Sequence, residues 1–481
     1  MEHDLVVIGG GPGGYATALY AAAAGMNVGL VEKSKLGGTC LHVGCIPAKE
    51  LLETANVYRT VSEAAEFGVA TSDTALDMAV AQQRKQAIID KLTKGVEGML
   101  KHRNVSVYSG VGQLVGGDSD GESGSSNGNS QKLHQVRISA GIETETLTAS
   151  NVVLASGSVP RTLPLPGFEY DAKSVINSDH LLSIKKAPQS AIIIGGGAIG
   201  CEFASLLGDF GTQVTLLETL PQLLPGADPD VSKLMARSFK KRKIAVQTGV
   251  SVTGCERTDS GVRVMLEGSD PLEADCVIVA IGRRPLSESL AAEKAGVAID
   301  KSGYVEVDEF CRTSVAGIYA VGDLVATPQL AHVGFAEGML VVGDILGESP
   351  EPINYGQVPW GIYTRPEVAF AGLTEPAAID AGYEVVTSTN RFGANSRAMI
   401  IGETEGFVKV VAEKKSDGSA GQVLGVHIVG PWATELLGQA YLAVSWEAEV
   451  GDVANLIQPH PTLSELYGEA MLSLTGRPLH G

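Results

Sequence analysis

A glycine-rich segment occurs twice in this chain, and the repeat constrains the fold more than any other feature. Residues 4–33 read DLVVIGGGPGGYATALYAAAAGMNVGLVEK, and residues 190–219 read SAIIIGGGAIGCEFASLLGDFGTQVTLLET. The two segments align without a gap at an offset of 186 residues. Each reads as a short apolar strand, a Gly-x-Gly-x-x-Gly turn, a helix rich in alanine and leucine, and a second apolar strand that ends in glutamate. The repeat predicts an α/β protein with two doubly wound folds.

The glycines of each copy fit a bound pyrophosphate. The first makes a tight turn, the second lets the backbone approach the pyrophosphate, and the third packs the helix on the strand. The helix N-terminus attracts the anion through its N–H groups, and the glutamate accepts hydrogen bonds from ribose hydroxyls. We therefore predict two Rossmann-like dinucleotide sites, one with Gly9, Gly11, Gly14 and Glu32, the other with Gly195, Gly197, Gly200 and Glu218.

The second site favours NAD over NADP. A carboxylate at Glu218 would repel a 2′-phosphate, which sites for NADP usually meet with arginine. No arginine lies between Glu218 and Arg237.

Two cysteines follow the first fingerprint, in the segment GGTCLHVGCIPAK at residues 37–49. Pro47 suits the first position of a helix, so Cys45 lies near a helix N-terminus, where the pKa of a thiol is lowered. The four residues between Cys40 and Cys45 form a loop able to close a small disulfide. Beside a flavin site such a pair would relay two electrons. The alternative is a pair of buried cysteines or a static disulfide.

A histidine near the C-terminus is the candidate base for thiol chemistry. His460 is held between prolines in QPHPTLSE, and Glu465 is near enough to orient its ring. Thr462-x-x-Glu465 also fits a helix capping box, which would make His460 an ordinary loop residue. The pattern leaves these two readings equal.

Composition excludes several classes of function. With 481 residues the chain predicts roughly three domains. A net charge of −19 argues against nucleic acid as a partner, and we expect neither a membrane span nor a signal peptide, hence a cytoplasmic protein. No histidine or cysteine spacing predicts a metal site. The remaining cysteines are expected to be buried apolar residues: Cys201, Cys255, Cys276 and Cys311.

The rest of the layout alternates helices and strands. Helices are expected from Pro47 to about residue 66 and over 79–101, and strands at 105–108, 135–138, 151–158, 276–281 and 317–323. The polar, glycine-rich stretch 116–131 reads as a disordered hairpin tip. Beyond about residue 350 a third domain of mixed strands and helices is expected, without a nucleotide fingerprint.

These motifs together resemble a known family. GGTCLHVGCIPAK, AIGRRP (280–285), GIYAVGD (317–323) and HPTLSE (460–465) occur in the order typical of the class I pyridine nucleotide–disulfide oxidoreductases, and the chain is similar to the dihydrolipoamide dehydrogenase group within that family. The resemblance covers nearly the whole length.

The resemblance implies a flavoenzyme that oxidises dihydrolipoamide to lipoamide and reduces NAD+ to NADH through a Cys40–Cys45 disulfide. It implies a homodimer with one non-covalent FAD per subunit. Its partner would be a lipoyl-bearing acyltransferase of a 2-oxoacid dehydrogenase complex, or the lipoyl protein of glycine cleavage. The implied domains are an FAD-binding domain (1–152), an NAD-binding domain (153–280), a central domain that completes the FAD site (281–350) and an interface, or dimerisation, domain of α+β type (351–481).

The resemblance also assigns roles to single residues. Cys45 would face the flavin and Cys40 the substrate, and Lys49 would lie near the flavin, paired with Glu202. His460, held by Glu465, would act as the base on the disulfide of the other subunit. FAD would be lined by Thr39, Gly112, Gly157, Asp323 and Ala331, and NAD by Glu218, Val252 and Gly282.

The chain departs from the family pattern at a few positions, and related activities are alternatives. His42 stands where asparagine is usual, Ala48 where serine is common, and Gln458-Pro459 where His-Ala is usual. A glutathione-type reductase should carry arginines after the second fingerprint strand, and a mercuric-type reductase a cysteine pair near the C-terminus. No cysteine follows Cys311. A flavoprotein that acts mainly as a docking subunit is a third alternative.

Overall fold

The computed structural model of the chain describes residues 2–116 and 133–480. Apart from Gly116, the stretch predicted as a hairpin tip lies outside the described residues. The chain divides into two compact units. The first comprises Met1–Glu50, Ala79–Arg161 and Arg283–Tyr355, and the second Leu51–Met78, Thr162–Gly282 and Gly356–Gly481.

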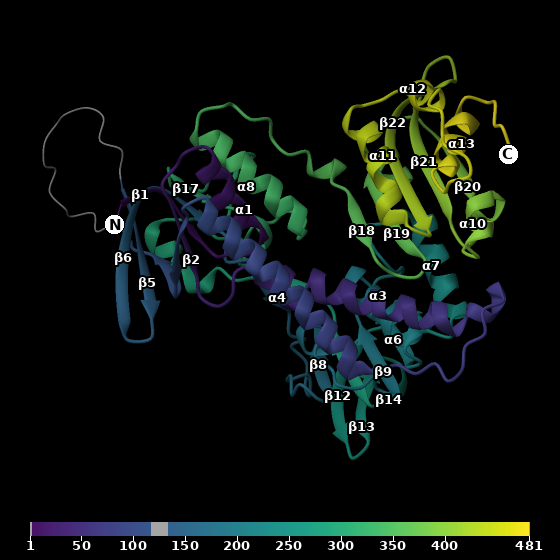
Figure 1. Cartoon of the computed structure of the whole chain (residues 1–481), viewed down its shortest axis with the longest axis horizontal. Coiled ribbons are helices and arrows are strands. Elements are labelled where there is room, and N and C mark those ends of the chain that lie inside the picture. Colours follow the sequence, from purple (N-terminus) through teal and green to yellow (C-terminus); the bar gives the residue numbers. More distant parts are fainter. Residues whose placement is uncertain (1, 117–132, 481) are drawn as a thin grey trace, which may run out of the picture. The chain divides into compact units, whose positions relative to one another are not determined.

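The first unit is built on a seven-stranded sheet (Figure 1). Its parallel strands are β3 (Ser106–Ser109), β2 (Val28–Glu32), β1 (Glu2–Ile8), β6 (Glu143–Leu154) and β17 (Ile318–Ala320), and β6 pairs with both β1 and β17. The sheet continues from β6 through two antiparallel strands, β5 (His134–Ala140) and β4 (Val111–Leu114). Antiparallel pairing allows short hairpin connections, whereas the parallel strands require helical crossovers.

Alternate side chains of β1 pack into two hydrophobic clusters, one on each face of the sheet. Leu5 and Val7 pack with side chains of three helices: α1 (Pro12–Ala23), α4 (Met78–His102) and α8 (Ala331–Ile345). Val6 and Ile8 point to the other face and pack with Leu114, Val136 and Ile138 of the antiparallel strands. Successive side chains of a strand point to opposite faces, so one apolar strand fills both layers. The predicted helix over 79–101 is confirmed as α4.

The second unit contains the second fingerprint. Its five-stranded parallel sheet has the order β11 (Ala245–Thr248), β10 (Gln213–Glu218), β9 (Ser190–Ile194), β15 (Cys276–Val279) and β8 (Val175–Asn177). Strand β15 is apolar throughout and β9 is apolar after its first residue, Ser190, as is usual for parallel strands covered on both faces. Helices of this part are α5 (Ser178–Leu181), α6 (Ala198–Asp209) and α7 (Pro229–Lys241), and β12 (Val252–Thr258), β13 (Gly261–Leu266) and β14 (Ser269–Ala274) form an antiparallel sheet.

The C-terminal part of the second unit is α+β, as predicted (Figure 1). Its antiparallel sheet has the order β18 (Trp360–Ile362), β19 (Glu367–Gly372), β22 (Ala420–Gly430), β21 (Phe407–Lys414) and β20 (Val385–Arg391). Its helices are α9 (Glu375–Asp380), α10 (Ser396–Ile400), α11 (Ala433–Ser445), α12 (Val450–Ala454) and α13 (Glu465–Leu474). The core of this part is made by the sheet with α11, α12 and α13. The predicted fold class is confirmed.

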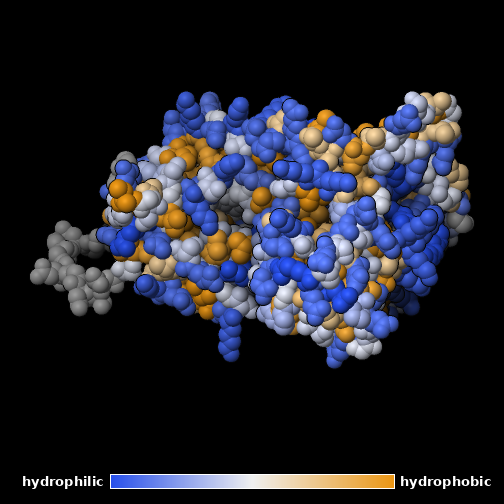
Figure 2. Space-filling model, turned by 90° about the horizontal axis from the view of Figure 1, so that it is seen from below, coloured by the Kyte–Doolittle hydropathy of each residue, from blue (hydrophilic) through white to orange (hydrophobic). Residues whose placement is uncertain are grey.

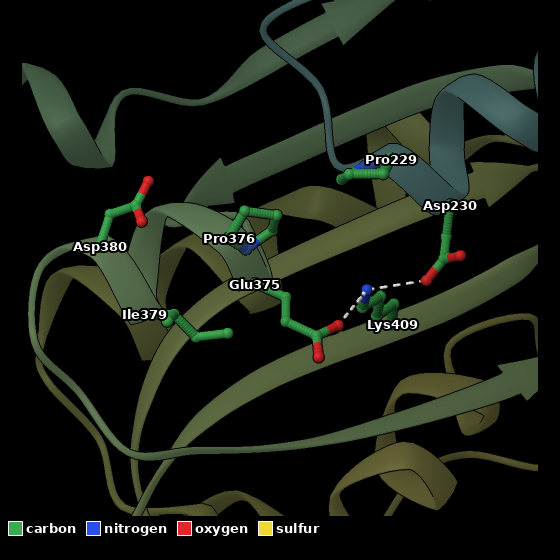
Figure 3. Close-up of a pocket in the computed structure, with 7 residues that line it drawn as sticks. All are labelled: Pro229, Asp230, Glu375, Pro376, Ile379, Asp380 and Lys409. Atoms are coloured by element: carbon green, nitrogen blue, oxygen red, sulfur yellow. Dashed lines mark hydrogen bonds and ion pairs between the residues drawn. The ribbon is translucent and has the colours of Figure 1, made fainter.

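A buried lysine joins this sheet to helix α7. Lys409 of β21 is 2% exposed, and its Nζ lies 3.0 Å from Asp228 Oδ1, 2.8 Å from Asp230 Oδ2 and 2.7 Å from Glu375 Oε2. Figure 3 shows Asp230 and Glu375 reaching Lys409 beside a pocket of about 380 Å³. Burial would lower the pKa of Lys409, but the three carboxylates raise it above its ordinary value. Burial would raise the pKa of Asp228, but the hydrogen bond from Lys409 and its other partners lower it.

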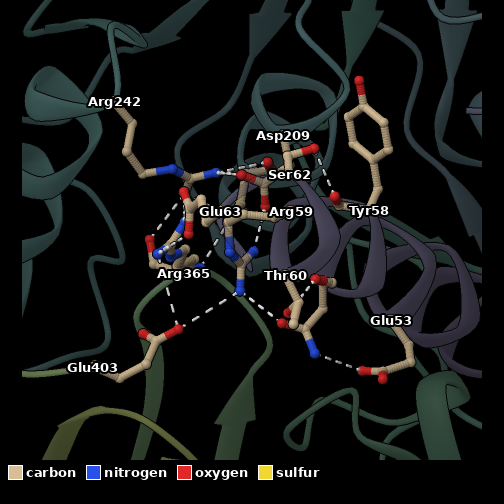
Figure 4. Close-up of polar contacts among 12 residues, drawn as sticks. Glu53, Tyr58, Arg59, Thr60, Ser62, Glu63, Asp209, Arg242, Arg365 and Glu403 are labelled. Carbon is tan, nitrogen blue, oxygen red and sulfur yellow. Dashed lines mark hydrogen bonds and ion pairs between the residues drawn. The ribbon is translucent and has the colours of Figure 1, made fainter. Parts of the chain in front are cut away.

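An arginine network joins the last turns of three helices in the same unit (Figure 4). Asp209, at the end of α6, accepts hydrogen bonds from Arg59 at 2.8 Å and from Arg242 at 2.8 Å. Arg242 also donates to the Arg365 carbonyl at 2.9 Å. Each oxygen of Asp209 accepts from a different guanidinium group, and these charge-assisted bonds, with the bond from Arg242 to the Arg365 carbonyl, fix the helix ends to the segment before β19.

Hydrophilic side chains predominate on the face of the molecule drawn in Figure 2. On the face in Figure 2 hydrophobic residues form small, separate patches among polar side chains. Among the described residues, every helix is too short or too polar to cross a membrane.

Candidate functional site: two dinucleotide folds and a thiol pair

The first fingerprint forms the tight turn that the sequence predicted. Gly9 follows β1 with φ +113°, and a Cβ there would lie 2.2 Å from the Ala155 carbonyl oxygen. A Cβ at Gly14 would lie 1.8 Å from the Gly9 oxygen, so this glycine allows α1 to pack on the turn. Gly11 is the N-cap of α1, and the nearest atom to its added Cβ is 3.9 Å away. Space is therefore free beside the second glycine, whereas the first and third glycines are in close contact with backbone atoms. A pyrophosphate site requires this free space at the second glycine.

The second fingerprint repeats this geometry. Gly195 has φ +110°, and its Cβ would lie 2.4 Å from the Ala280 oxygen. A Cβ at Gly200 would lie 1.8 Å from the Gly195 oxygen, and one at Gly197 would meet nothing within 4 Å. The two sites therefore match residue by residue and fit two dinucleotides.

The two acids also occupy equivalent positions. Glu32 accepts hydrogen bonds from Gly10 N–H and Ser34 N–H, both at 2.7 Å. Glu218 accepts from Gly196 N–H at 2.6 Å and Leu220 N–H at 2.8 Å. Each carboxylate is fixed beside the middle of its glycine turn. Their oxygens have further lone pairs for ribose hydroxyls.

The thiol pair is held on two helices rather than in a loop. Cys40 lies inside the short helix α2 (Gly38–Val43), and Cys45 is the first residue of α3 (Cys45–Ser62). The prediction of a helix starting at Pro47 was wrong by two residues, because Gly44 alone is sufficient to separate α2 from α3. A Cβ at Gly44 would lie 2.9 Å from the Thr39 oxygen.

Helix α2 is seated directly on the first fingerprint. A Cβ at Gly38 would lie 2.6 Å from Gly11 Cα, so only glycine permits this approach. Gly37 and Gly38 both have positive φ, +100° and +57°, and turn the chain into α2. The helix that carries Cys40 therefore lies against the first dinucleotide turn, as well as following it in the sequence.

The two thiols differ in their surroundings. Cys40 is half-buried, Cys45 is exposed, and both are thiols in this structure. The hydrogen bond with Cys45 and burial raise the pKa of Cys40, whereas the charge of Lys49 opposes this rise. Cys40 therefore holds its proton more tightly than an isolated thiol does. Burial and the nearby charge of Cys40 raise the pKa of Tyr15 of α1 above its ordinary value.

Asp323 belongs to a polar cluster that sequence reasoning found only in part. Its Oδ2 accepts a hydrogen bond from Ser158 Oγ at 2.5 Å and lies 3.7 Å from Arg283 Nε. Arg283 donates to Ser158 Oγ at 2.7 Å and to the Ser158 carbonyl at 2.8 Å. Gly157, with φ +72°, turns the chain just before Ser158. The antiparallel pair β7 (Ser158–Pro160) and β16 (Arg283–Pro285) brings these residues together. The signal for Arg283 was its place in the AIGRRP motif.

The other predicted cofactor residues fall into both units. Thr39 lies in α2, and Ala331 is the first residue of α8. A Cβ at Gly112 would lie 2.9 Å from the Ile8 side chain. In the second unit, Val252 begins β12 and Gly282 has φ +102°.

Glu202 is also in the second unit, where it accepts a hydrogen bond from Tyr363 N–H at 2.9 Å. Lys49 is in the first unit, and its pairing with Glu202 stays a prediction.

His460 and Glu465 form a hydrogen-bonded pair. His460 Nδ1 lies 2.7 Å from Glu465 Oε1, while Thr462 N–H donates to Glu465 Oε2 at 2.7 Å. Burial would raise the pKa of Glu465, but the Thr462 and His460 hydrogen bonds lower it below its ordinary value. The side chain of His460 is 72% exposed, which leaves its Nε2 side open.

The capping box predicted at this motif is not formed, because no N-cap side chain accepts a hydrogen bond at the start of α13. Glu465 uses one oxygen for the backbone at the start of the helix and the other for the imidazole. Ser464, not Thr462, is the N-cap residue of α13.

Two dinucleotide folds, with a thiol pair seated on the first of them, define a class of flavin- and nicotinamide-dependent disulfide oxidoreductases. Comparison with protein families agrees: the family described as pyridine nucleotide-disulphide oxidoreductase matches residues 3–338, and its dimerisation domain matches residues 358–471. The chain belongs to the pyridine nucleotide-disulphide oxidoreductase family. The dimerisation domain supports a homodimer.

Proteins of similar sequence narrow the choice of activity within this family. The chain is 40% identical to a dihydrolipoyl dehydrogenase of Bacillus subtilis (strain 168), over 100% of this chain and 99% of that protein. It is 40% identical to a dihydrolipoyl dehydrogenase of Chlorobaculum parvum, over 98% of this chain and 96% of that protein.

Among solved structures, LpdA from Mycobacterium tuberculosis superposes with a TM-score of 0.88 at 26% identity, covering 98% of this chain and 99% of that one. The flavoprotein disulfide reductase RclA from Escherichia coli gives 0.84 at 25% identity, covering 98% and 99%. Both structures share the fold at similar identity, so the fold alone does not separate the activities of the family. The full-length relatives at 40% identity favour dihydrolipoyl dehydrogenase over the other reductases.

Proposed function

We propose that the protein oxidises protein-bound dihydrolipoamide to lipoamide and reduces NAD+ to NADH. The observation that carries this proposal is the seating of the thiol helix α2 on the first fingerprint, where Gly38 approaches Gly11. The second fingerprint supplies a separate nicotinamide site in the same chain. The dihydrolipoyl dehydrogenases at 40% identity support the choice of substrate.

The first dinucleotide fold takes FAD and the second takes NAD+. FAD, when bound, supplies the two-electron chemistry that connects the thiol pair to NAD+. Its pyrophosphate would be held at the N-terminus of α1 and its ribose by Glu32. Asp323, Gly157, Thr39, Gly112 and Ala331 complete the proposed FAD site, and Glu218, Val252 and Gly282 the proposed NAD site. Glu218 selects against the 2′-phosphate of NADP by charge repulsion.

The thiols carry the exchange with substrate. One thiolate of dihydrolipoamide attacks the Cys40 sulfur of the Cys40–Cys45 disulfide, and Cys45 leaves as a thiolate. The second substrate sulfur then attacks the first, which closes lipoamide and releases the Cys40 sulfur, and Cys40 takes up a proton. The substrate loses two electrons and two protons, and the thiol pair gains two electrons. The raised pKa of Cys40 agrees with its taking up the proton in this step.

His460 of the partner subunit is the proposed base. It accepts the substrate thiol proton, and Glu465 holds the imidazole so that Nε2 faces outward and stabilises the imidazolium that forms. In the family this arrangement makes the homodimer necessary for catalysis. Lys49 would support the electron transfer as a fixed positive charge, paired with Glu202.

The proposed physiological partner is a lipoyl-bearing acyltransferase or a lipoyl protein, in the cytoplasm, where thiols stay reduced. We assign residues 1–152 to FAD binding, 153–280 to NAD binding, 281–350 to the central domain and 351–481 to the dimer interface.

The test is anaerobic titration of the FAD-loaded protein with dihydrolipoamide, followed by NAD+. The wild type should develop long-wavelength absorbance and then form NADH. Cys40→Ser should retain FAD but lose dihydrolipoamide turnover by at least about 10³-fold, because the exchange thiol is absent. Cys276→Ala removes a buried thiol of strand β15 and should retain turnover. Full dihydrolipoamide activity in Cys40→Ser would contradict the assignment.

A further inference from the structure

Helix α8 carries a fully buried carboxylate that the thiol chemistry does not use. Glu337 is 0% exposed. Its Oε2 accepts a hydrogen bond from Gly322 N–H at 2.5 Å. Its Oε1 accepts from the Thr327 hydroxyl at 2.7 Å and from the Tyr355 hydroxyl at 3.1 Å. Three donors, two from the segment 322–331 and one from Tyr355, therefore converge on one side chain.

The charge of this carboxylate is held by neutral donors. Within residues 2–116 and 133–480, Glu337 makes no ion pair with a basic side chain. Burial raises its pKa, and the hydrogen bonds from Gly322, Thr327 and Tyr355 oppose that rise. Burying an acid costs free energy unless its oxygens are fully hydrogen bonded. The donors must therefore be placed accurately, and in return the carboxylate fixes the segments that carry them.

The segment that Glu337 fixes is the one assigned to FAD. Gly322 has φ +71° and begins the turn that presents Asp323. The chain then runs through Thr327 to Ala331, where α8 begins. Glu337 thus holds both the start and the middle of the segment 322–331 from one point on α8. Asp323 and Ala331, the proposed FAD contacts, lie at the two ends of this segment.

The helix that carries Glu337 packs closely on the FAD fingerprint helix. A Cβ at Gly334 would lie 3.3 Å from Gly13 N, and one at Gly338 would lie 2.4 Å from Thr17 Oγ1. These two glycines flank Glu337 on α8 and allow α1 and α8 to approach. The position of Glu337 is therefore fixed relative to α1, the helix that presents the pyrophosphate site.

We propose that Glu337 is a positioning residue for FAD, which sets the Asp323 turn against the fingerprint helix α1. This inference rests on the proposed use of FAD. Without the carboxylate, Gly322 N–H and the Thr327 hydroxyl lose their acceptor, and the segment 322–331 is no longer fixed before FAD binds. FAD would then have to order the segment itself, which weakens its binding.

The experiment measures the FAD dissociation constant of deflavinated protein, with thermal unfolding of the same samples. Glu337→Leu keeps the approximate volume and removes the acceptors, and should weaken FAD binding tenfold or more. Glu337→Gln should stay within about threefold of the wild type. Its amide oxygen can accept from Gly322 N–H, and its NH₂ can donate to the two hydroxyls, which can turn to accept.

Asp344 provides the matched control. It lies on the same helix, is largely buried, and accepts hydrogen bonds from Tyr319 OH at 3.0 Å and from Arg312. Asp344→Leu therefore removes a comparable carboxylate that does not bind the segment 322–331, and should leave the FAD dissociation constant within about threefold. If Glu337→Leu does not fold, Thr327→Val removes one donor without changing core volume and should still weaken FAD binding severalfold.

The outcomes separate the two proposals. Weakened FAD binding in Glu337→Leu, rescue by Glu337→Gln and little change in Asp344→Leu would support the inference. Unchanged FAD binding in Glu337→Leu, or in Thr327→Val where that variant is needed, would overturn it, as would equal weakening in Asp344→Leu. A wild-type protein that binds no FAD would overturn the proposed function as well, whereas a wild type that binds FAD with unaffected variants would overturn this inference alone.

Discussion

The second and third glycines of the second fingerprint should respond to alanine in opposite ways. At Gly197 the backbone is extended, with φ −74° and ψ −173°, and an added Cβ meets nothing within 4 Å. At Gly200 an added Cβ would lie 1.8 Å from the Gly195 carbonyl oxygen. Gly197→Ala should therefore damage NAD+ binding and spare the fold, and Gly200→Ala should damage the fold.

The magnitudes follow from opposing effects. Alanine is a poorer N-cap than glycine by about 0.5–1 kcal/mol. It also restricts the unfolded chain, which stabilises the folded state by about 0.4–1 kcal/mol. These contributions nearly cancel for Gly197→Ala. At Gly200 the contact is with backbone, which cannot rotate away, so the cost should be about 3 kcal/mol or more.

The assay combines thermal unfolding, FAD content and the KM for NAD+. Gly197→Ala should unfold within about 2 °C of the wild type and retain FAD, but its KM for NAD+ should rise at least about tenfold, because the methyl group occupies the space a pyrophosphate needs. Gly200→Ala should lower the unfolding temperature by several degrees. A Gly197→Ala variant with an unchanged KM for NAD+ would refute the assignment of the second fingerprint to the pyrophosphate of NAD+.

Two further perturbations test charged groups. Lys409→Met should destabilise the protein by about 3–5 kcal/mol in chemical denaturation, because it leaves Asp228 buried without its cation. Lys415→Met, which removes an exposed partner of Glu449, should cost no more than about 1 kcal/mol, and equal losses would contradict the argument. Glu465→Gln should lower turnover by about tenfold or more, with FAD retained, because the imidazole of His460 loses the carboxylate that orients it. Since the pKa of Glu465 is lowered by folding, its stabilising effect should be present above the ordinary carboxyl range near pH 4 and disappear as the pH falls below that range. A stability difference between wild type and Glu465→Gln that persists at pH 2 would contradict this sign.

Local features of the sequence predicted the fold well. The two fingerprints repeat at a fixed offset, and the structure repeats the positive φ of Gly9 at Gly195 and the crowding of Gly14 at Gly200. These are steric properties of a few adjacent residues, so they can be read from the chain itself. The four isolated cysteines, expected to be buried, are all buried.

The ends of helices and strands were less predictable where a single residue determines them. The residues around Cys40 were expected to form a loop, yet they form α2, because Gly37 and Gly38 adopt positive φ and start a helical turn. The strand expected over 317–323 is shorter, since it ends at Ala320 and Gly322 begins a single 3₁₀ turn. Apolar runs predict that a strand exists, but a glycine with positive φ sets its end.

Partnerships between distant residues were not predictable from the chain. Ser158, Arg283 and Asp323 meet because β7 and β16 pair across more than a hundred residues. Glu337 and Tyr355 carry no motif, and their relation to Gly322 depends on the packing of α8.

The sequence by itself determined the two dinucleotide turns, the acids that follow them and the positions of the thiols. These depend on backbone sterics and spacing within about thirty residues. The tertiary structure alone decided that Gly38 lets the thiol helix rest on Gly11, and that Glu337 holds the turn of Asp323. Such contacts join segments that are separated in sequence, and only the packing of the core brings these segments together.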